Sequence, residues 1–361
     1  MPPRCDLLSL TVSFLTTCTK KLRDLKTKKM RNKFILGLIA IIGFFISLAL
    51  HQHIRVLRDI VHTYSTFYPL LQSHASLLYK YPAPIARTGQ IPRIIHQVAL
   101  GNVNMAKYQD GIKSCRALHP GWKFNLWTDR NGTAFIAEHY PEILPHYLGY
   151  HQNIQRANVL RYGVLHFYGG VYFDLDMTCL MPLDQTPLVD LPFVTPGAHP
   201  AGVNNAFILA RPGHAFLSRI LSTIPRHDLY WGLLIRFPYI ENMLSTGCMF
   251  FSNMWMQYAG DVIAGHQKER IYILADEHGD MAPHMWRGIV KSPIMAHGGD
   301  SSWHSWDAGI IVTMGKHYRL VLSALAVGIT FGIMFLLCLC YRARIQGRRV
   351  WRKQSSKVIF W

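Results

Sequence analysis

The sequence has few charged residues, and few acidic ones in particular. Only 16% of its 361 residues are charged, whereas 50% are hydrophobic. A typical globular domain is about a quarter charged. Disorder requires low hydrophobicity, so this composition excludes a disordered chain. The sequence also lacks internal repeats and low-complexity stretches, which excludes a repeat architecture. The composition therefore indicates a globular chain that contains membrane segments.

Cysteine is also scarce. Of the seven cysteines, only Cys115, Cys179 and Cys248 lie between the two long apolar runs of the chain. Three cysteines form at most one disulfide, so we do not expect a fold built on disulfides. The same region has a single N-glycosylation sequon, Asn131-Gly132-Thr133.

The two apolar runs are candidate membrane spans. Phe34–Leu50 has 17 residues and Leu320–Tyr341 has 22, all without charge. A spanning helix needs roughly 20 apolar residues, and the alternative for either run is a buried core helix. The first run has a second alternative, a cleaved signal peptide. Its long basic flank and the poor cleavage site at Leu48-Ala49-Leu50 favour an uncleaved anchor. We therefore predict two transmembrane helices.

The charge distribution predicts the orientation of these spans. The net charge of +18 suggests nucleic acid as a partner if taken alone. However, residues 1–33 carry +7 and residues 342–361 carry another +7, whereas residues 51–319 carry only +4. Basic flanks stay on the cytosolic side. We therefore expect a multi-pass membrane protein with cytosolic termini, a lumenal middle region and no nucleic-acid partner.

Short apolar runs alternate with helical patterns in the middle region. We predict strands over Arg93–Ala99, Lys123–Thr128, Val171–Leu175 and Asn205–Ala210. A helix is predicted over Asn153–Tyr168, and Gly169-Gly170 should end it, because glycine accepts the left-handed conformation at a helix terminus. Strands that alternate with helices predict an α/β sheet with helices on its faces. In such sheets, ligands bind at the carboxyl ends of the strands.

These patterns divide the chain into six parts. We predict a basic cytosolic tail (1–33), a transmembrane helix (34–50), a stem (51–90), a lumenal domain (91–310), a second transmembrane helix (320–341) and a second basic tail (342–361).

The third predicted strand leads into two carboxylates, Asp174 and Asp176. Side chains alternate along a strand, so both should point to the same face. Two like charges this close repel each other unless a cation compensates them. A divalent metal with oxygen ligands would do so, and its open positions would accept diphosphate oxygens. The alternative is a solvated turn at a strand end, which an isolated Asp-x-Asp pattern favours.

The predicted helix before this strand adds polar side chains. Asn158 and Arg161 lie three residues apart, so they share one face of the helix. Arg161 is suited to a forked contact with phosphate or sugar oxygens. Arg156 lies elsewhere on the helix, and an ordinary surface or packing role suits it equally well.

Together these motifs resemble glycosyltransferase family 32, the DXD sugar-transferase group. The matching stretches are Arg156–Tyr162, Gly169–Tyr172 with Asp174–Asp176, Ile91–Gln97, and Pro120–Trp122 with Leu126–Asp129. The resemblance covers roughly residues 91–260, with a weaker match near 297–307. Within the family, the arrangement is most similar to fungal mannosyltransferases that act on inositol phosphorylceramide.

The resemblance implies a GT-A fold, a Rossmann-like mixed sheet with flanking helices, here between two transmembrane helices. It implies a divalent metal, Mn²⁺ or Mg²⁺, and GDP-mannose as the donor. Asp174 and Asp176 would hold the metal together with His304, for which His297 is the alternative. Asn158 and Arg161 would act beside them in catalysis. The nucleotide-sugar pocket would include Ile95, His96, Gln97, Trp127, Asn158, Arg161, Asp174 and His304.

The implied function is a retaining mannosyltransferase that moves mannose from GDP-mannose to inositol phosphorylceramide. Because no residue is a convincing nucleophile, we expect a front-face route with the nucleotide phosphate as the base. One alternative is an α-mannosyltransferase of N-glycans. Another is a catalytically weak scaffold or regulatory subunit, which Asn158 and Ala206 motivate, since family members often carry aspartate there. The intact Asp174 and Asp176 argue against it.

The expected partners are therefore the nucleotide-sugar donor, a membrane lipid acceptor and a regulatory membrane subunit. Trp231–Ile240 is apolar and aromatic, with Arg236 embedded in it. This stretch is either ordinary core or a membrane-facing edge that admits the lipid, with Arg236 near its anionic headgroup.

Overall fold

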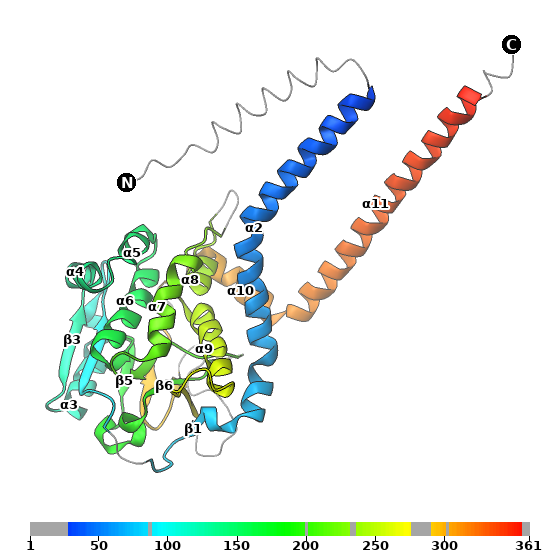
Figure 1. Ribbon diagram of the computed structural model, residues 1–361. Coiled ribbons are helices and arrows are strands. Elements are labelled where there is room, and N and C mark those ends of the chain that lie inside the picture. Colours follow the sequence, from blue (N-terminus) through cyan, green and yellow to red (C-terminus); the bar gives the residue numbers. More distant parts are fainter. Residues whose placement is uncertain are drawn as a thin grey trace. The chain divides into compact units, whose positions relative to one another are not determined.

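The computed structural model describes residues 28–85, 89–198, 201–231, 236–275, 290–300 and 303–355 (Figure 1). The chain forms two compact units. The first comprises Met1–Tyr230 and Glu241–Asp300, and the second comprises Trp231–Ile240 and Ser301–Trp361. Residues 1–27 and 356–361, which make up most of the first predicted tail and the end of the second, lie outside the described residues.

The first unit is built on a seven-stranded mixed sheet with the strand order β1-β8-β6-β7-β4-β2-β3. Its strands are Leu78–Lys80 (β1), Ile94–Val98 (β2), Lys123–Trp127 (β3), Gly170–Phe173 (β4), Phe193–Pro196 (β6), Phe207–Ala210 (β7) and Tyr272–Ala275 (β8). Only β7 is antiparallel to its neighbours in this sheet. The predicted mixed α/β architecture is confirmed, and the four predicted strands are present with ends shifted by at most two residues.

A small antiparallel sheet stands beside it, with the order β5-β10-β9. Its strands are Met177–Cys179 (β5), Val290–Lys291 (β9) and Met295–His297 (β10). β5 follows β4 after a short turn, and His297 pairs in register with Met177. This sheet therefore brings the end of the first unit next to the predicted carboxylate pair.

The helices of the first unit are Lys28–Ser73 (α2), Gln109–Leu118 (α3), Asp129–His139 (α4), Leu144–Gly149 (α5), Asn153–Tyr168 (α6), Ala215–His227 (α7) and Cys248–Ile263 (α9). The second unit contains Trp306–Lys316 (α10) and Tyr318–Ser355 (α11), and Pro238–Ser245 (α8) contributes to both units. Short 3-10 helices cover Ala75–Leu77 (η1), Met105–Tyr108 (η2), Leu183–Gln185 (η3) and Pro187–Asp190 (η4).

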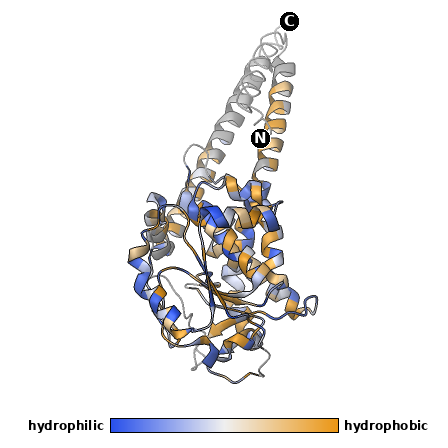
Figure 2. Ribbon diagram, turned by 90° about the vertical axis from the view of Figure 1, so that its left-hand side faces the viewer, coloured by the Kyte–Doolittle hydropathy of each residue, from blue (hydrophilic) through white to orange (hydrophobic). Residues whose placement is uncertain are grey.

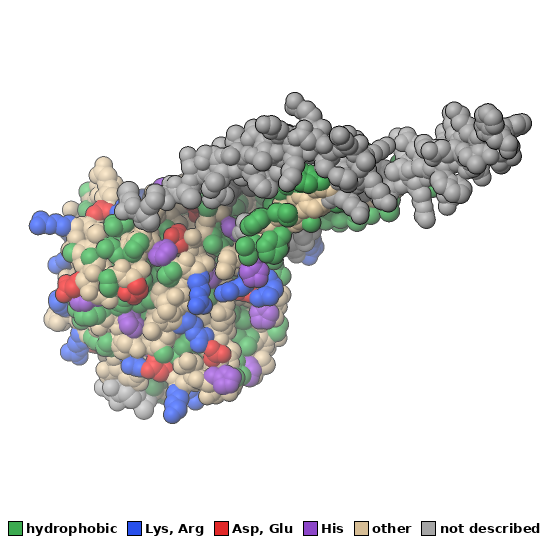
Figure 3. Space-filling model, turned by 45° about the horizontal axis from the view of Figure 1, so that its top comes forward, with side chains coloured by type: hydrophobic (Ala, Val, Ile, Leu, Met, Phe, Trp, Pro, Cys, Tyr) green, Lys and Arg blue, Asp and Glu red, His purple; other side chains and the backbone are tan. Residues whose placement is uncertain are grey.

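The main sheet separates two hydrophobic clusters. Tyr172 of β4 packs into the cluster formed with α2, α6, α7 and α9, whereas Val171 and Phe173 pack into the cluster with α3 and the small sheet. This alternation is the period of two that a strand imposes on its side chains. Figure 2 shows hydrophobic residues concentrated along the strands. Figure 3 shows acidic and basic side chains interspersed on one face.

The helix α6 has the bounds that the spacing predicts. It ends at Gly169, with φ of 65°, and Gly170 follows with φ of 99°. A Cβ at Gly169 would approach Pro212 to 2.6 Å, and one at Gly170 would collide with the carbonyl oxygen of Ile94. Only glycine fits both positions, so the two glycines turn the chain directly from α6 into β4.

The predicted stem is largely part of the fold. The helix α2 continues from residue 28 to residue 73, and its Phe67 and Leu71 are buried in the core. Thr63 Oγ1 donates a hydrogen bond of 2.6 Å to Asn253 Oδ1 of α9. β1 then joins the edge of the sheet through β8. The folded region therefore begins before residue 91, because apolar side chains on the last turns of α2 pack into the core.

Among the described residues, no single helix is long and apolar enough to cross a membrane. Two segments of α2, Phe34–Leu48 and Leu50–Ser73, meet at a bend of 47° and together have the length and composition of a span. In α11, Arg319–Phe335 is a shorter apolar helix. The two predicted transmembrane helices stay a prediction.

One disulfide links α3 to β5. It joins Cys115 to Cys179, whereas Cys248 is free. The pairing agrees with the expectation of at most one bond in this region. Ser114 Oγ strengthens the same junction by donating to the carbonyl of Cys179 at 3.0 Å.

Removal of this disulfide should destabilise the first unit. The bond closes a loop with a sequence separation of 64 residues. Replacing Cys115 and Cys179 by alanine should lower the free energy of unfolding by about 2–5 kcal/mol. Thermal unfolding of the detergent-solubilised protein measures this change, and Cys338→Ala serves as the control because Cys338 is a free, exposed cysteine. Equal melting temperatures of the double variant and the control would contradict the prediction.

Candidate active site

The two predicted carboxylates lie in the turn between β4 and β5. β4 ends at Phe173, and the amide of Met177 donates to the carbonyl of Asp174 at 3.2 Å, which closes the turn. The amide of Asp174 donates to the carbonyl of Ala206, just before β7, at 3.0 Å. The strand is shorter than predicted, so a turn, and not the pleat of a strand, brings Asp174 and Asp176 together.

A histidine completes a group with these carboxylates. One ligand atom from each of Asp174, Asp176 and His297 lies within 4.8 Å of the others. His297 Nε2 is 3.4 Å from Asp176 Oδ2. The side chains are 30%, 13% and 13% exposed in that order, so the group is partly open to solvent. Two carboxylates and an imidazole form a donor set that suits a divalent cation such as Mn²⁺.

The electrostatics of Asp176 test whether this group fits a cation. Burial raises the pKa of Asp176, and the neighbouring charge of Asp174 raises it further, while His297 and the amide of Asp300 lower it. That amide donates to Asp176 Oδ2 at 2.7 Å. These two partners therefore offset only part of the combined effect of burial and repulsion on Asp176, and a bound cation would favour its charged form. The residues fit a divalent metal.

Arg161 holds Asp174 in place. Its buried guanidinium donates through Nη2 to Asp174 Oδ1 at 2.8 Å and through Nη1 to the carbonyl of Asn205 at 2.5 Å. The guanidinium lies 4.3 Å from the centre of the Tyr172 ring. The Tyr172 hydroxyl also donates to Asp174 Oδ1, at 2.7 Å. Arg161 thus lies beside the carboxylates, as predicted. The two terminal nitrogens of its guanidinium bind protein oxygens.

Asn158 lies in a buried polar network between α6, α8 and α9. Its Nδ2 donates to Asn242 Oδ1 at 2.9 Å and to Thr246 Oγ1 at 3.2 Å. Its Oδ1 accepts from Asn205 Nδ2 at 3.2 Å. Asn205 Nδ2 also donates to the Tyr162 hydroxyl at 2.8 Å. The network supports the segment whose carbonyl binds Arg161, and a contact of Asn158 with the donor sugar stays a prediction.

Four of the eight residues predicted to line the nucleotide-sugar pocket lie on β2 and β3. Ile95 and His96 are fully buried, and Gln97 and Trp127 are nearly so. Trp127 Nε1 donates to His96 Nδ1 at 3.1 Å, so Nε2 carries the ring proton and donates to the carbonyl of Gly169 at 3.0 Å. Gln97 Nε2 has no hydrogen-bond partner among the described residues. Their contact with a nucleotide stays a prediction.

His304 belongs to the second unit. There its ring packs edge-on against Trp303, at 4.5 Å between centroids, and against Tyr239, at 5.3 Å. The metal role predicted for His304 stays a prediction, and the histidine found beside the carboxylates is His297. Residues 232–235 of the predicted membrane-facing stretch Trp231–Ile240 lie outside the described part of the chain.

Sequence reasoning missed three residues of this site. Tyr172 lies two positions before Asp174, so strand alternation alone could have placed it on the same side. Asn205 gave no local signal, because its role depends on contacts with α6 and α9. Asp300 lies in the loop after His297, where the sequence analysis predicted only histidines as site residues.

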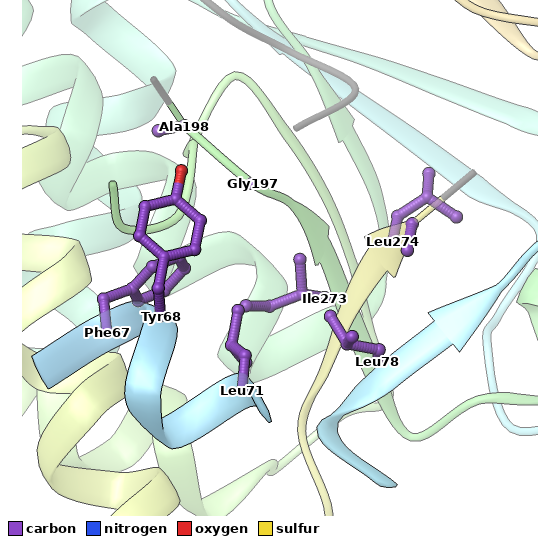
Figure 4. Close-up of a pocket in the computed structure, with 9 residues that line it drawn as sticks. Phe67, Tyr68, Leu71, Leu78, Gly197, Ala198, Ile273 and Leu274 are labelled. Atoms are coloured by element: carbon purple, nitrogen blue, oxygen red, sulfur yellow. The ribbon is translucent and has the colours of Figure 1, made fainter. Parts of the chain in front are cut away.

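A small apolar pocket is separate from this group (Figure 4). It is lined by Phe67, Tyr68, Leu71, Leu78, Gly197, Ala198, Ile273, Leu274 and Ala275. None of these residues belongs to the carboxylate group, and only Tyr68 offers a polar side chain. The pocket therefore lacks the charged groups that a diphosphate requires.

A known family model matches the part of the chain that carries the two carboxylates of this group. Residues 106–190 match the family model described as the glycosyltransferase sugar-binding region containing the DXD motif, and this range includes Asp174 and Asp176. The chain belongs to this family of DXD glycosyltransferases, as its relatives also indicate.

Two relatives that cover most of the chain are fungal proteins. Inositol phosphoceramide mannosyltransferase 3 of Schizosaccharomyces pombe is 33% identical over 287 residues, which is 78% of this chain and 76% of the relative. Mannosyl phosphorylinositol ceramide synthase SUR1 of Saccharomyces cerevisiae is 33% identical over 277 residues, 75% of this chain and 68% of the relative. Among solved structures, the PaToxG glycosyltransferase is 14% identical, covers 58% of this chain and 83% of its own, and has a TM-score of 0.36.

The buried His96 should make the fold sensitive to acid. Burial lowers the pKa of His96 to about 4, whereas an unfolded histidine takes up a proton below about 6.5. The contribution of neutral, buried His96 to the free energy of unfolding is therefore complete above pH 6.5, and it is lost as the pH falls toward 4. Each pH unit in that window should cost about 1.4 kcal/mol. His96→Gln should flatten this dependence in thermal unfolding measured between pH 7.5 and 5.

The matched control is His151→Gln, since His151 is exposed. It should keep the wild-type pH dependence. An unchanged slope in His96→Gln would show that His96 is not a source of the acid sensitivity.

Proposed function

We propose that this chain transfers mannose from GDP-mannose to inositol phosphorylceramide with retention of configuration. The observation that supports this most directly is the group formed by Asp174, Asp176 and His297 at the end of β4. Relatives that cover about three quarters of the chain are named as an inositol phosphoceramide mannosyltransferase and a mannosyl phosphorylinositol ceramide synthase. The acceptor is therefore a lipid, and the donor is a nucleotide sugar. The diphosphate of this donor would bind at the metal that the carboxylate group holds.

The described residues divide the work of the site. Asp174, Asp176 and His297 would hold Mn²⁺ or Mg²⁺, which supplies charge stabilisation for the departing nucleotide. Arg161 and Tyr172 orient Asp174 through two hydrogen bonds to one oxygen. The amide of Asp300 orients Asp176. We propose a front-face route, in which the acceptor hydroxyl gives its proton to a phosphate oxygen of the departing nucleotide.

The two departures from the family pattern leave this group intact. Ala206 contributes its carbonyl to the amide of Asp174, a contact that does not depend on its side chain. Asn158 makes three hydrogen bonds in the buried network, and a neutral amide suits those partners. Both observations weigh against the reading as a catalytically weak scaffold.

We also propose a location for the reaction. The basic tails at both ends and the apolar stretches beside them support a multi-pass protein of the Golgi or ER membrane with cytosolic termini. The catalytic unit would then face the lumen, where an embedded lipid acceptor is within reach. A regulatory membrane subunit would be held through the same membrane segments.

The transfer reaction is tested by loss of one carboxylate. Membranes that contain wild type, Asp176→Asn or Asp110→Asn are incubated with Mn²⁺, GDP-mannose and inositol phosphorylceramide, and the lipids are analysed by mass spectrometry. Wild type and the exposed control Asp110→Asn should yield mannosylated lipid. Asp176→Asn should be at least about 100-fold slower, because several kcal/mol of charge stabilisation are lost.

Other outcomes of this assay favour the alternatives. Mannose transfer to a glycoprotein acceptor alone would indicate an N-glycan α-mannosyltransferase. Absence of transfer in wild type, together with indistinguishable wild type and Asp176→Asn, would leave the scaffold as the better reading.

The membrane orientation is tested by protease digestion of intact microsomes that contain a chain tagged at both termini. Both tags should be removed, whereas the middle region should resist digestion until detergent is added. Tags that survive in intact microsomes would refute the proposed orientation.

A further inference from the structure

The segment His297–Asp300 is attached to Asp176 at two points. The amide of Gly298 donates to the carbonyl of Asp176 at 2.8 Å, and the amide of Asp300 donates to its Oδ2 at 2.7 Å. A Cβ on Gly298 would stand 3.0 Å from the Asp176 carbonyl oxygen, so the approach is close. The position of His297 relative to Asp176 therefore depends on how this segment is held.

The Asp300 carboxylate is held by residues from a distant part of the sequence. Its Oδ2 accepts from Lys107 Nζ at 2.6 Å and from the Tyr108 hydroxyl at 2.5 Å. The Asp300 side chain is 18% exposed, whereas that of Lys107 is 56% exposed. We call these three residues the Asp300 cluster. Both donors therefore bind the same carboxylate oxygen, and the ammonium group makes its hydrogen bond charge-assisted.

The two donors of the Asp300 cluster lie on a segment, η2 and α3, that is covalently linked to β5. Lys107 and Tyr108 belong to η2, which leads directly into α3. The disulfide between Cys115 and Cys179 joins α3 to β5. Gly111 of α3 has no side chain, and a Cβ there would stand 2.5 Å from the carbonyl oxygen of Met177. The segment of η2 and α3 is thus fixed to β5, the strand that starts immediately after Asp176.

We propose that the Asp300 cluster positions the metal site, by keeping the His297–Asp300 segment against Asp176. Lys107, Tyr108 and Asp300 are positioning residues in this view, and the metal ligands remain Asp174, Asp176 and His297. The inference rests on the proposed function for the metal itself. Partners of metal ligands typically change metal affinity by about 10- to 100-fold when they are removed.

The test measures metal binding without any substrate. Full-length protein in detergent is titrated with Mn²⁺, and free Mn²⁺ is read by electron paramagnetic resonance. Asp300→Ala should weaken binding by about 10- to 100-fold, and Lys107→Met by about 10-fold. Lys107→Arg keeps the cation and should restore near wild-type affinity. Lys113→Met, an exposed lysine on α3, is the matched control and should bind as wild type does.

A double variant tests whether the two residues act together. In the Asp300→Ala background, Lys107→Met should have no further effect, because its partner is already absent. In the transfer assay, the Mn²⁺ concentration for half-maximal rate should rise in both single variants. The rate at saturating Mn²⁺ should be largely recovered, since all three ligands are intact. A general structural defect would instead lower the melting temperature and the saturated rate.

Three results would overturn the inference: wild-type Mn²⁺ affinity in both single variants, additive effects in the double variant, or equal losses in Lys107→Met and Lys107→Arg. These are distinguishable from failure of the proposed function. In that case wild type would bind Mn²⁺ with the predicted dependence on Lys107 and Asp300, yet no mannosylated lipid would form.

Discussion

The repulsion between Asp174 and Asp176 is the constraint on which the surrounding structure depends. Two carboxylates in one short turn are costly unless they are compensated from outside. Arg161 and Tyr172 donate hydrogen bonds to Asp174. Asp176 is contacted by His297 and by the amide of Asp300. Helix α6, strand β4 and the small sheet are arranged so that these partners reach the turn. The architecture thus concentrates negative charge and leaves part of it for a cation.

The connection between α6 and β4 contributes to the same end. His96 donates to the carbonyl of Gly169, and Gly170 lies against the backbone of β2. Because two glycines make the turn, α6 packs back onto the sheet with Arg161 facing the end of β4. The geometry of the carboxylate site therefore also depends on groups outside the turn itself, among them the buried, neutral His96.

Much of the fold could be predicted from sequence, because hydrophobic spacing reports which side of an element is buried. It predicted β2, β3, β4, β7 and the bounds of α6. Spacing does not report which elements become neighbours. The edge strand β1 from the stem and the antiparallel direction of β7 were therefore not predicted. The site shows the same limit: Asp174, Asp176 and Arg161 are close in sequence, whereas the contact of Lys107 with Asp300 joins residues 193 positions apart.

The bond between Cys115 and Cys179 has a consequence beyond the stability of the fold. It connects the helix that follows Lys107 and Tyr108 to the strand that follows Asp176. An oxidising compartment forms such a bond, and a reducing one does not. The geometry of the carboxylate turn is thereby linked to the redox state of the place where the chain matures. A molecule that folds in the wrong compartment would keep its aspartates but lack the covalent link beside them.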